Sequence, residues 1–447
     1  MRQSRYNVVL ERDELTWIHN GLSGRTVAVP PRDWSDALAF IGGDHSRMPA
    51  VETLRDLTVA RMFVNDDTDE LAVLERRFRA GTSDRSAFAL TIVTSLGCNF
   101  DCPYCFENKP AAILDEETER LLLEVVDAQL PTIERFDVTW YGGEPLLAAD
   151  RIDRLSEAFL ERTRASEVAY SASIVTNGYL LTPDVARRLK TLGVNRVQIT
   201  LDGPAEVHDL MRPLRNGRGT FDVVLENVVA CADLIPISIR VNLDASNVGE
   251  YLRLLDLLVE RGLAGRVSVN PGHIVAYPDQ AGAPSETYGT RCFTLPEFAD
   301  VERDFLAAAY ERGLAKPRLP GPIGSPCTAV RTNDLVVGAR GELYKCYDNV
   351  GDPREVIGHL RSWRDPNDRV LKWLSYDPFT DDGCRSCIAL PTCMGGCAHH
   401  QMMDPGDAKC STFRLTHRRQ VEEYADAAEA GRPTAGPRHR LLPLTPV

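Results

Sequence analysis

From about residue 88 onward, the hydrophobic and polar positions of the chain alternate between two patterns. Short runs rich in β-branched and aromatic residues are separated by longer segments in which apolar residues recur every three or four positions. These patterns are typical of β-strands that alternate with amphipathic helices. The predicted strands are 88–94, 136–140, 169–175, 196–201, 236–242 and 266–270. The predicted helices are 115–129, 149–164, 183–192, 221–232 and 248–261.

Connections of this length require parallel strands joined by right-handed crossovers. Six strands are too few for a closed eight-stranded barrel, so we predict an α/β fold with a partial (β/α)6 TIM-type barrel over residues 88–290. In such a fold the loops after the strands lie on one face, where the chemistry takes place. Thr182, Pro183 and Gly193 mark the ends of the third helix, and Asn247 with Glu250 predicts a capping box for the fifth.

The first 87 residues follow another pattern, which predicts a small α+β module. Strand-like stretches at 6–10, 15–19 and 25–29 precede helical segments at 34–41, 51–60 and 70–79, and residues 80–86 read as a linker. At the other end, residues 416–447 form a separate segment. A helix over 415–430 is followed there by a Pro/Gly/Arg-rich tail that we expect to be mobile.

Composition and charge narrow the possible functions. A chain of 447 residues suggests about three domains, and a net charge of −13 argues against a nucleic-acid partner. The sequence has no run of the roughly 18 apolar residues that a membrane span needs, and its start does not resemble a signal peptide. We therefore expect a cytoplasmic protein without membrane contact. Twelve cysteines in that reducing compartment indicate metal binding or catalysis rather than disulfides.

Three cysteines stand close together just after the first predicted strand, as Cys98-x3-Cys102-x2-Cys105. A tetrahedral zinc site or a cluster held only by protein needs four ligands. Either a fourth ligand comes from elsewhere in the chain, as in a zinc knuckle with one remote ligand, or one metal position stays open. Three thiolates at this spacing can hold a 4Fe–4S cluster with one open iron.

The three cysteines, with Tyr104 before the last of them, resemble the signature of radical SAM enzymes. The resemblance implies that S-adenosylmethionine (SAM) chelates the open iron through its amino and carboxylate groups. An electron from the cluster then cleaves SAM, and the resulting 5′-deoxyadenosyl radical abstracts hydrogen from a substrate. The cofactor supplies this chemistry, and the protein positions it.

Residues after the next three strands strengthen the resemblance. Gly142, Gly143, Glu144 and Pro145 match the family's GGEP segment, whose glycine amides and glutamate would bind the SAM amino group. By the same resemblance, the ribose or carboxylate of SAM and the substrate would be contacted from the later loops by Thr176, Asn177, Asp202 and Arg212. On sequence alone, Thr176 and Asn177 could instead form a strand-to-helix turn, and Asp202 could simply form a turn.

Seven more cysteines fall in residues 327–410, within a predicted domain over 291–415, at Cys327, Cys346, Cys384, Cys387, Cys393, Cys397 and Cys410. Their spacing resembles the SPASM domain, which binds two auxiliary 4Fe–4S clusters; a pair of zinc ribbons is the alternative. The resemblance assigns the outer cluster to Cys384, Cys387, Cys393 and Cys410. It assigns the inner cluster to Cys327, Cys346 and Cys397. No cysteine directly precedes Cys327, so either Cys292 is the fourth inner ligand or that cluster has an open iron.

SPASM-containing radical SAM enzymes mostly modify peptides, which makes maturation of a ribosomally made peptide the favoured function. In sulfatase maturases, the alternative, a catalytic aspartate directly follows the cysteine of the G-x4-C element. Here Tyr347 follows Cys346 and Asp348 comes one residue later, which turns the carboxylate another way if the segment is extended. Tyr347, Asp348 and Asp202 are the candidate catalytic residues.

The resemblance also implies partners. The N-terminal module is similar to winged-helix domains that recognise a leader peptide by adding it as a strand to a sheet edge, although it could equally be a plain cap on the barrel. We therefore expect a precursor peptide with a leader, and a low-potential electron donor such as flavodoxin or ferredoxin. The hypotheses from other classes are a zinc-ribbon interaction protein and a multi-cluster electron-transfer or scaffold protein.

Overall fold

The computed structural model describes the whole chain except residues 109, 276–282, 289–290, 366, 404–409 and 436–447. It divides into two compact units. Unit 1 contains residues 1–83, 316–327 and 376–447, and unit 2 contains residues 84–315 and 328–375. The units cross the predicted domain boundaries, because residues 376–415 of the predicted SPASM region lie in the same unit as the N-terminal module.

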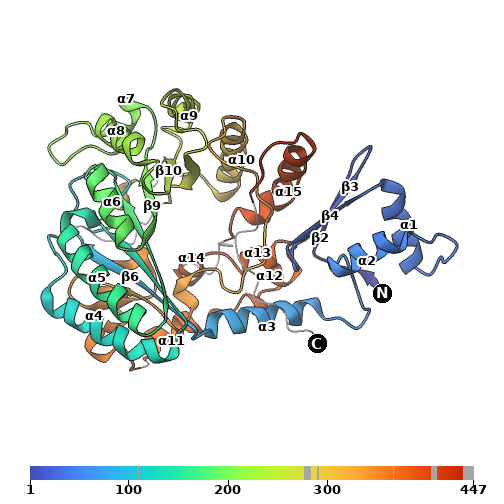
Figure 1. Ribbon diagram of the computed structural model, residues 1–447, viewed down its shortest axis with the longest axis horizontal. Helices are drawn as coiled ribbons and strands as arrows, with labels where there is room; N and C mark the ends of the chain where they lie inside the picture. The colour runs from blue at the N-terminus through green and yellow to red at the C-terminus, as the bar shows by residue number, and fades with distance from the viewer. Residues whose placement is uncertain (109, 276–282, 289–290, 366, 404–409, 436–447) are drawn as a thin grey trace. The chain divides into compact units, whose positions relative to one another are not determined.

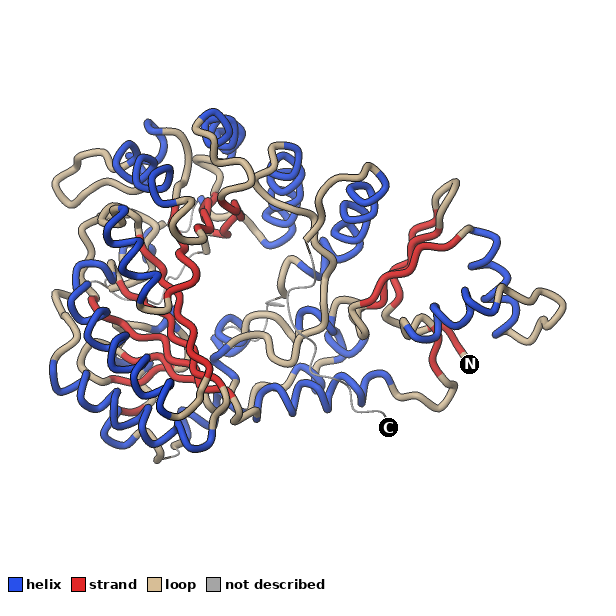
Figure 2. Tube along the Cα trace, in the orientation of Figure 1, coloured by secondary structure: helices blue, strands red, loops and turns tan. Residues whose placement is uncertain are grey.

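Unit 2 is built on a nine-stranded, mainly parallel sheet with the order β11-β10-β9-β8-β7-β6-β12-β13-β14 (Figures 1 and 2). The first six strands are β6 (Ala87–Ser95), β7 (Arg135–Gly142), β8 (Ala169–Thr176), β9 (Val194–Thr200), β10 (Ile237–Leu243) and β11 (Val267–His273). They are parallel neighbours in chain order. The six predicted strands and the mixed α/β class are confirmed, whereas the partial barrel stays a prediction.

The five predicted helices follow these strands as α4 (Glu116–Gln129), α5 (Ala149–Ala165), α6 (Pro183–Thr191), α8 (Phe221–Cys231) and α9 (Tyr251–Glu260). Figure 1 shows α4, α5 and α6 along one face of the sheet. Alternate side chains of β7 are buried, and Phe136 packs edge to face on Phe159 of α5 with ring centroids 5.2 Å apart. The predicted ends of α6 are confirmed, because the Thr182 side chain accepts from Val185 N and Gly193 has φ +83°.

The capping box predicted at Asn247 is wrong. Asn247 makes no cap bond, and a short 3₁₀ turn (Val248–Glu250) precedes α9. Its side-chain oxygen accepts from Asp244 N, and its amide donates to the carbonyls of Asp202 and Asn242. The asparagine therefore joins the loops after β9 and β10 instead of starting the helix.

Several elements of unit 2 were not predicted. They are α7 (Ala205–Met211), α10 (Leu295–Glu311), β12 (Asp334–Val337), β13 (Glu342–Tyr344), β14 (Gly358–His359) and α11 (Asp368–Leu374). Helix α10 begins with a capping box formed by Thr294 and Glu297, and it packs against β11 and α9. Strand β12 pairs parallel to β6, and β13 and β14 continue the sheet antiparallel.

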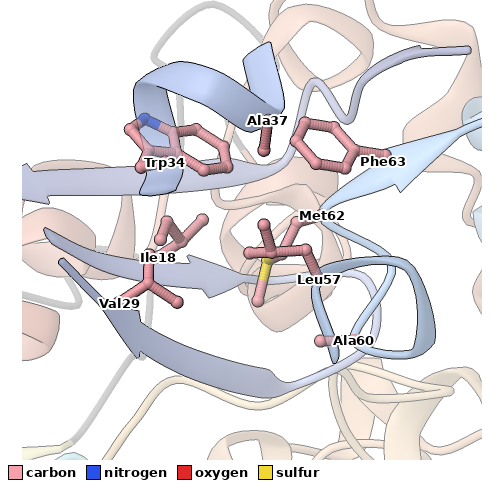
Figure 3. Close-up of a cluster of buried hydrophobic side chains, with 8 residues drawn as sticks. All are labelled: Ile18, Val29, Trp34, Ala37, Leu57, Ala60, Met62 and Phe63. Atoms are coloured by element: carbon pink, nitrogen blue, oxygen red, sulfur yellow. The ribbon is translucent and has the colours of Figure 1, made fainter. Parts of the chain in front are cut away.

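In unit 1, β2 (Asn7–Glu11), β3 (Thr16–Asn20) and β4 (Arg25–Val29) form an antiparallel sheet in the order β2-β3-β4. Helices α1 (Pro31–Ile41) and α2 (Val51–Val59) cover one face. There Ile18, Val29, Trp34 and Leu57 belong to one buried cluster (Figure 3). Helix α15 (Phe413–Glu429) covers the other face, where Val8 and Leu10 pack on Val421 and Ala425. Strand alternation accounts for the two faces.

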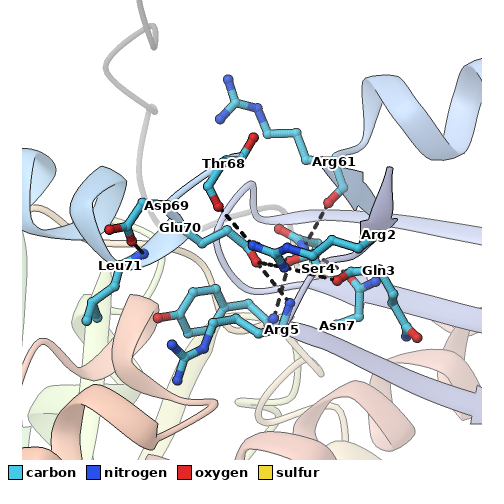
Figure 4. A network of polar contacts seen from close by, with 12 residues as sticks. Arg2, Gln3, Ser4, Arg5, Asn7, Arg61, Thr68, Asp69, Glu70 and Leu71 are labelled. Atoms are coloured by element: carbon cyan, nitrogen blue, oxygen red, sulfur yellow. Dashed lines mark hydrogen bonds and ion pairs between the residues drawn. The ribbon is translucent and has the colours of Figure 1, made fainter. Parts of the chain in front are cut away.

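The rest of unit 1 includes β1 (Arg2–Gln3), which pairs with β5 (Phe63–Val64), and α12 (Asp382–Ser386), α13 (Leu390–Cys393) and α14 (Ala398–Met403). Helix α3 (Glu70–Ser83) continues through the first half of the predicted linker, so that boundary was wrong. Buried Glu70 ties the start of α3 to the N-terminus, because it accepts from Arg2, Ser4 and the Arg5 amide (Figure 4). None of the described helices is long and apolar enough to cross a membrane.

Candidate functional site

The predicted site residues of unit 2 gather at the carboxyl ends of its parallel strands. The cysteine loop follows β6, the double glycine ends β7, Thr176 ends β8, and Asp202 follows β9. Because neighbouring parallel strands end at the same edge of a sheet, these loops meet there. The pairing of Ser95 with Gly142 brings the first two loops together directly.

In the cysteine loop, Cys98 and Cys102 are buried and Cys105 is half-buried. The Phe100 amide donates to Cys98 Sγ at 3.4 Å, a bond that a thiolate accepts better than a thiol. Within the described residues, none of the twelve cysteines forms a disulfide. Among the residues that the structure describes, no three His, Cys, Asp or Glu side chains form a group that could hold a single metal ion. A cubane cluster spreads its ligands over separate irons, so its thiolates do not have to meet at one point.

The glycines of the GGEP segment let the second loop pack directly on the cysteine loop. Gly143 N donates to Ser95 O at 2.9 Å, and Glu144 N donates to Gly97 O at 3.0 Å. Gly142 has φ +128°, and a Cβ at Gly143 would lie 2.5 Å from Leu96 O. These two amides are thus engaged within the protein. The glycines serve the close approach of two backbones.

Glu144 is fully buried at the centre of the site. Its carboxylate accepts from Thr176 Oγ1 and Asn177 N, both at 2.7 Å, and from Leu146 N at 3.0 Å, just after Pro145. Burial raises the pKa of Glu144, and these hydrogen bonds oppose the rise. Glu144 therefore joins the loops after β7 and β8. The role of Thr176 and Asn177 in this arrangement is to donate hydrogen bonds to its carboxylate.

Tyr104, Asp202 and Arg212 form a second buried network. The Tyr104 hydroxyl donates to Asp202 Oδ2, and Arg212 Nη1 donates to the same hydroxyl at 2.5 Å. The Arg212 guanidinium lies 3.8 Å from Asp202 Oδ2, and the Asn242 amide donates to Asp202 Oδ1 at 2.9 Å. Burial raises the pKa of Asp202, and the charge of Arg212 opposes the rise. The predicted residues Tyr104, Asp202 and Arg212 are thus brought together.

Arg212 retains a donor that the protein does not use. The residue is nine-tenths buried, and its Nε has no hydrogen-bond partner among the residues that the structure describes. Its guanidinium carbon also lies 5.6 Å from the centre of the Phe100 ring, on the cysteine loop. A buried guanidinium with a spare N–H fits a carboxylate ligand beside the three thiols. The residues present therefore suit a cluster with a bound amino acid such as SAM.

Two residues that were not predicted from the sequence, Tyr141 and Glu107, belong to a group of side chains with Tyr347 and Asp348. Tyr141 lies 5.6 Å, ring to ring, from Tyr347. The Tyr141 side chain hydrogen-bonds that of Glu107, which is buried; burial raises the pKa of Tyr141, and the charges of Glu107 and Asp348 raise it further. Glu107 comes two residues after Cys105, and Tyr141 directly precedes the double glycine, so their places beside recognised motifs were the available signal.

Residues close in sequence to Glu107 and Asp348 enclose a cavity of about 170 Å³. It is lined by residues 106 and 108, which follow the last cysteine of the loop, and by residues 350–354, which follow Asp348. The same segments approach each other at Gly351, where a Cβ would lie 3.0 Å from Asn108 O. Sequence gave no signal for this cavity, because it joins segments about 240 residues apart.

The other predicted cysteines are divided between the units. Cys346 is buried after β13 in unit 2, and Cys292 packs against the cluster of Met211, Ile274 and Tyr288 in the same unit. The cysteines in unit 1 are Cys327, Cys384, Cys387, Cys393, Cys397 and Cys410.

Within unit 1, the four cysteines predicted for the outer cluster influence one another electrostatically. Burial raises the pKa of Cys384 to about 12, the neighbouring Asp381 adds to the rise, and Cys393 and Cys410 contribute less. Burial also raises the pKa of Cys393, with Cys387 and Cys410 contributing. Thiols gathered in this way are suited to sharing a metal cluster, which stabilises their ionised form.

Comparisons with known proteins agree with this site. The profile of the Radical SAM superfamily matches residues 92–267. Mycofactocin maturase MftC of Mycobacterium tuberculosis is 30% identical over 328 residues, which cover 69% of this chain and 77% of MftC.

Two groups of solved structures share the fold. The structure titled native anSMEcpe with bound AdoMet and Cp18Cys peptide superposes with a TM-score of 0.55 and 18% identity, over 77% of this chain and 98% of that one. Streptococcus suis SuiB bound to precursor peptide SuiA gives a TM-score of 0.52 and 13% identity, over 92% of this chain and 99% of that one. With the MftC similarity and the three-cysteine loop, the conclusion is that this chain is an enzyme of the radical SAM superfamily.

Proposed function

We propose that the protein is a radical SAM peptide maturase that installs a crosslink or another modification in a ribosomally made peptide. The observation that carries the proposal is the meeting of the cysteine loop, the Glu144 loop and the spare donor of Arg212 at one edge of the sheet. The names of its relatives supply the substrate class, because MftC is a maturase and SuiB binds a precursor peptide.

In this proposal, Cys98, Cys102 and Cys105 hold a 4Fe–4S cluster, and Arg212 receives the carboxylate of SAM. When bound, the pair supplies a 5′-deoxyadenosyl radical that abstracts hydrogen from the peptide. Asp202 and Tyr104 hold the Arg212 guanidinium in place, and Glu144 fixes the loops that surround the cofactor. A low-potential donor such as flavodoxin or ferredoxin would supply the electron. The six parallel strands would curve into a partial barrel around this site.

The C-terminal cysteines would form a SPASM domain with two auxiliary clusters. The mutual electrostatic influence of Cys384, Cys387, Cys393 and Cys410 supports the outer cluster. For the inner cluster the proposal keeps Cys327, Cys346 and Cys397. Cys292 packs against the apolar cluster of Met211, Ile274 and Tyr288, so the proposal gives the inner cluster an open iron in preference to a fourth ligand from Cys292.

The leader of the peptide would bind to unit 1 along β4, an outer strand of its sheet. Helix α2 contacts β4, and Arg25 Nη1 of β4 donates to Val59 O at 2.7 Å. Apolar side chains are exposed at and just before this helix, with Met48 65%, Val51 73% and Val59 59% exposed. An extended leader could pair its backbone with β4 and place apolar side chains over α2.

A formylglycine-generating activity is the second candidate, and the structure changes the argument about Asp348. Residues Tyr347–Asn349 form a 3₁₀ turn, not the extended segment on which the sequence argument was based. Successive residues of a 3₁₀ turn are still about 120° apart, since it has three residues per turn. Tyr347 is 48% exposed and takes the place next to Cys346, so the proposal remains a peptide crosslink or related modification.

Mass spectrometry tests the proposal. Short peptides encoded beside the gene are incubated without oxygen with the reconstituted enzyme, SAM and a reductant. The expected result is a mass change in one of these peptides. This change should require both SAM and the leader segment of the peptide. The V59K variant, with a charge on the exposed surface of α2, should weaken peptide binding and leave SAM cleavage intact. A mass change in a sulfatase peptide alone would instead support the second candidate.

A further inference from the structure

A short segment after β11 lies against the cysteine loop. Residues Pro284–Thr287 form a 3₁₀ turn, and Ser285 N donates to Cys105 O at 3.0 Å. The Tyr288 ring then meets the Tyr104 ring edge-on, with centroids 6.1 Å apart. Both contacts are made to the part of the loop that carries the last of the three cysteines, so the position of the turn relative to Cys105 is fixed by backbone and ring packing.

The Ser285 side chain is the unusual part of this turn. The residue is only 1% exposed, and its hydroxyl has no hydrogen-bond partner within the described part of the chain. A buried hydroxyl without a partner is unfavourable, because it has given up its hydrogen bonds to water and gained none in return. Ala283 and Tyr288 on either side are also buried, so water has little access. The described part of the protein therefore provides no acceptor for this hydroxyl, and a bound group could supply one.

Charge distinguishes this donor from Arg212. The Arg212 guanidinium carries a full positive charge, and its spare Nε suits a carboxylate. A neutral hydroxyl held next to the backbone of Cys105 is suited to a softer anionic acceptor, the sulfur of a ligating thiolate or of the cluster. Hydrogen bonds to cluster sulfurs are among the features that set the reduction potential of iron–sulfur sites.

We propose that Ser285 donates its hydroxyl hydrogen to a sulfur of the iron–sulfur cluster held by Cys98, Cys102 and Cys105, and that this bond raises the cluster's reduction potential. The inference rests on the proposed cluster ligation. Its sign follows from electrostatics, because reduction by one electron adds negative charge to the sulfurs and a nearby donor stabilises that charge. Ser285 is thus a positioning and tuning residue, which acts through the cluster.

The test is an EPR-monitored redox titration of the reconstituted full-length protein without SAM, on the S285A variant. A C384A/C387A background simplifies the auxiliary-cluster signals. Thr287→Ala is the matched control, because Thr287 lies on the same turn and is exposed. The expected result is a midpoint potential more negative in S285A than in the parent, with T287A unchanged and S285T, which keeps the hydroxyl, close to the parent. Should S285A fail to retain iron, S285G is titrated in its place, with the same expectation.

An unchanged midpoint in the alanine or glycine variant, at full iron content, overturns the inference. So does a variant that changes only the affinity for SAM, because the hydroxyl would then face SAM and not the cluster. A failure of the proposed function would give a different result. In that case the parent protein itself would not assemble a cluster that depends on Cys98.

Discussion

The Asp202–Arg212 pair offers a sharp test of the site's energetics. The guanidinium and carboxylate lie 3.8 Å apart, and both side chains are buried. Two unit charges at this distance attract by about 4 kcal/mol at an effective dielectric constant of ~20. The D202N variant keeps the shape and removes the charge, which deprives the buried Arg212 cation of its ion-pair partner. Breaking a buried pair in this way costs about 3–5 kcal/mol.

The assay is calorimetric unfolding of the reconstituted protein. For a domain of this size, each kcal/mol corresponds to about 2–4 °C, so D202N should melt roughly 6–20 °C below the parent. The double variant D202N/R212M removes both charges and should recover at least half of that loss, because replacing a whole buried pair is often nearly neutral. A loss below about 1 kcal/mol in D202N, or a double variant no more stable than D202N, would refute the reasoning.

Two further predictions concern local geometry and titration. Gly143→Ala places a Cβ 2.5 Å from Leu96 O and should lower the amount of iron bound by the cysteine loop. Gly249→Ala is the control and should leave the iron content unchanged, because its Cβ would meet no atom of the described structure within 4 Å. Equal iron in both variants would contradict the packing argument. Burial lowers the pKa of His417 to about 4. Because the unfolded chain binds this proton near pH 6.5, the stability of unit 1 should fall as the pH drops from about 6.5 to about 4. The H417Q variant should therefore show a smaller change in melting temperature between pH 7 and pH 5 than the parent. An unchanged pH dependence would argue against a neutral buried histidine.

The repeating part of the fold could be predicted from sequence because its signals are local. Strands β6 and β10 bury most of their side chains, so a run of apolar residues marks each of them whatever its neighbours are. Helix ends were equally visible where a cap contacts its own helix, as at Thr182. Asn247 could cap a helix in the same way, but its side-chain amide instead donates to the carbonyls of Asp202 and Asn242 and so joins two loops.

What sequence could not predict depends on distant contacts. Strand β13 has three residues and is stabilised by pairing with β12 and β14, so it carries no period of its own. Motifs indicated which loops meet at the site, but not that Glu144 holds two of them together or that Tyr141 and Glu107 pair. The grouping of the N-terminal sheet with α15 required packing between residues about 410 positions apart, which no local pattern records.

The central claim is that Cys98, Cys102 and Cys105 hold a cluster with one iron open to SAM. The most direct measurement is 5′-deoxyadenosine formation by the oxygen-free reconstituted protein with SAM and dithionite, for the parent and for a C98A/C102A/C105A variant. The account predicts 5′-deoxyadenosine from the parent and none from the variant, which should keep the iron of its auxiliary clusters. Intact SAM beside the fully reduced parent, or equal 5′-deoxyadenosine from the variant, would contradict it.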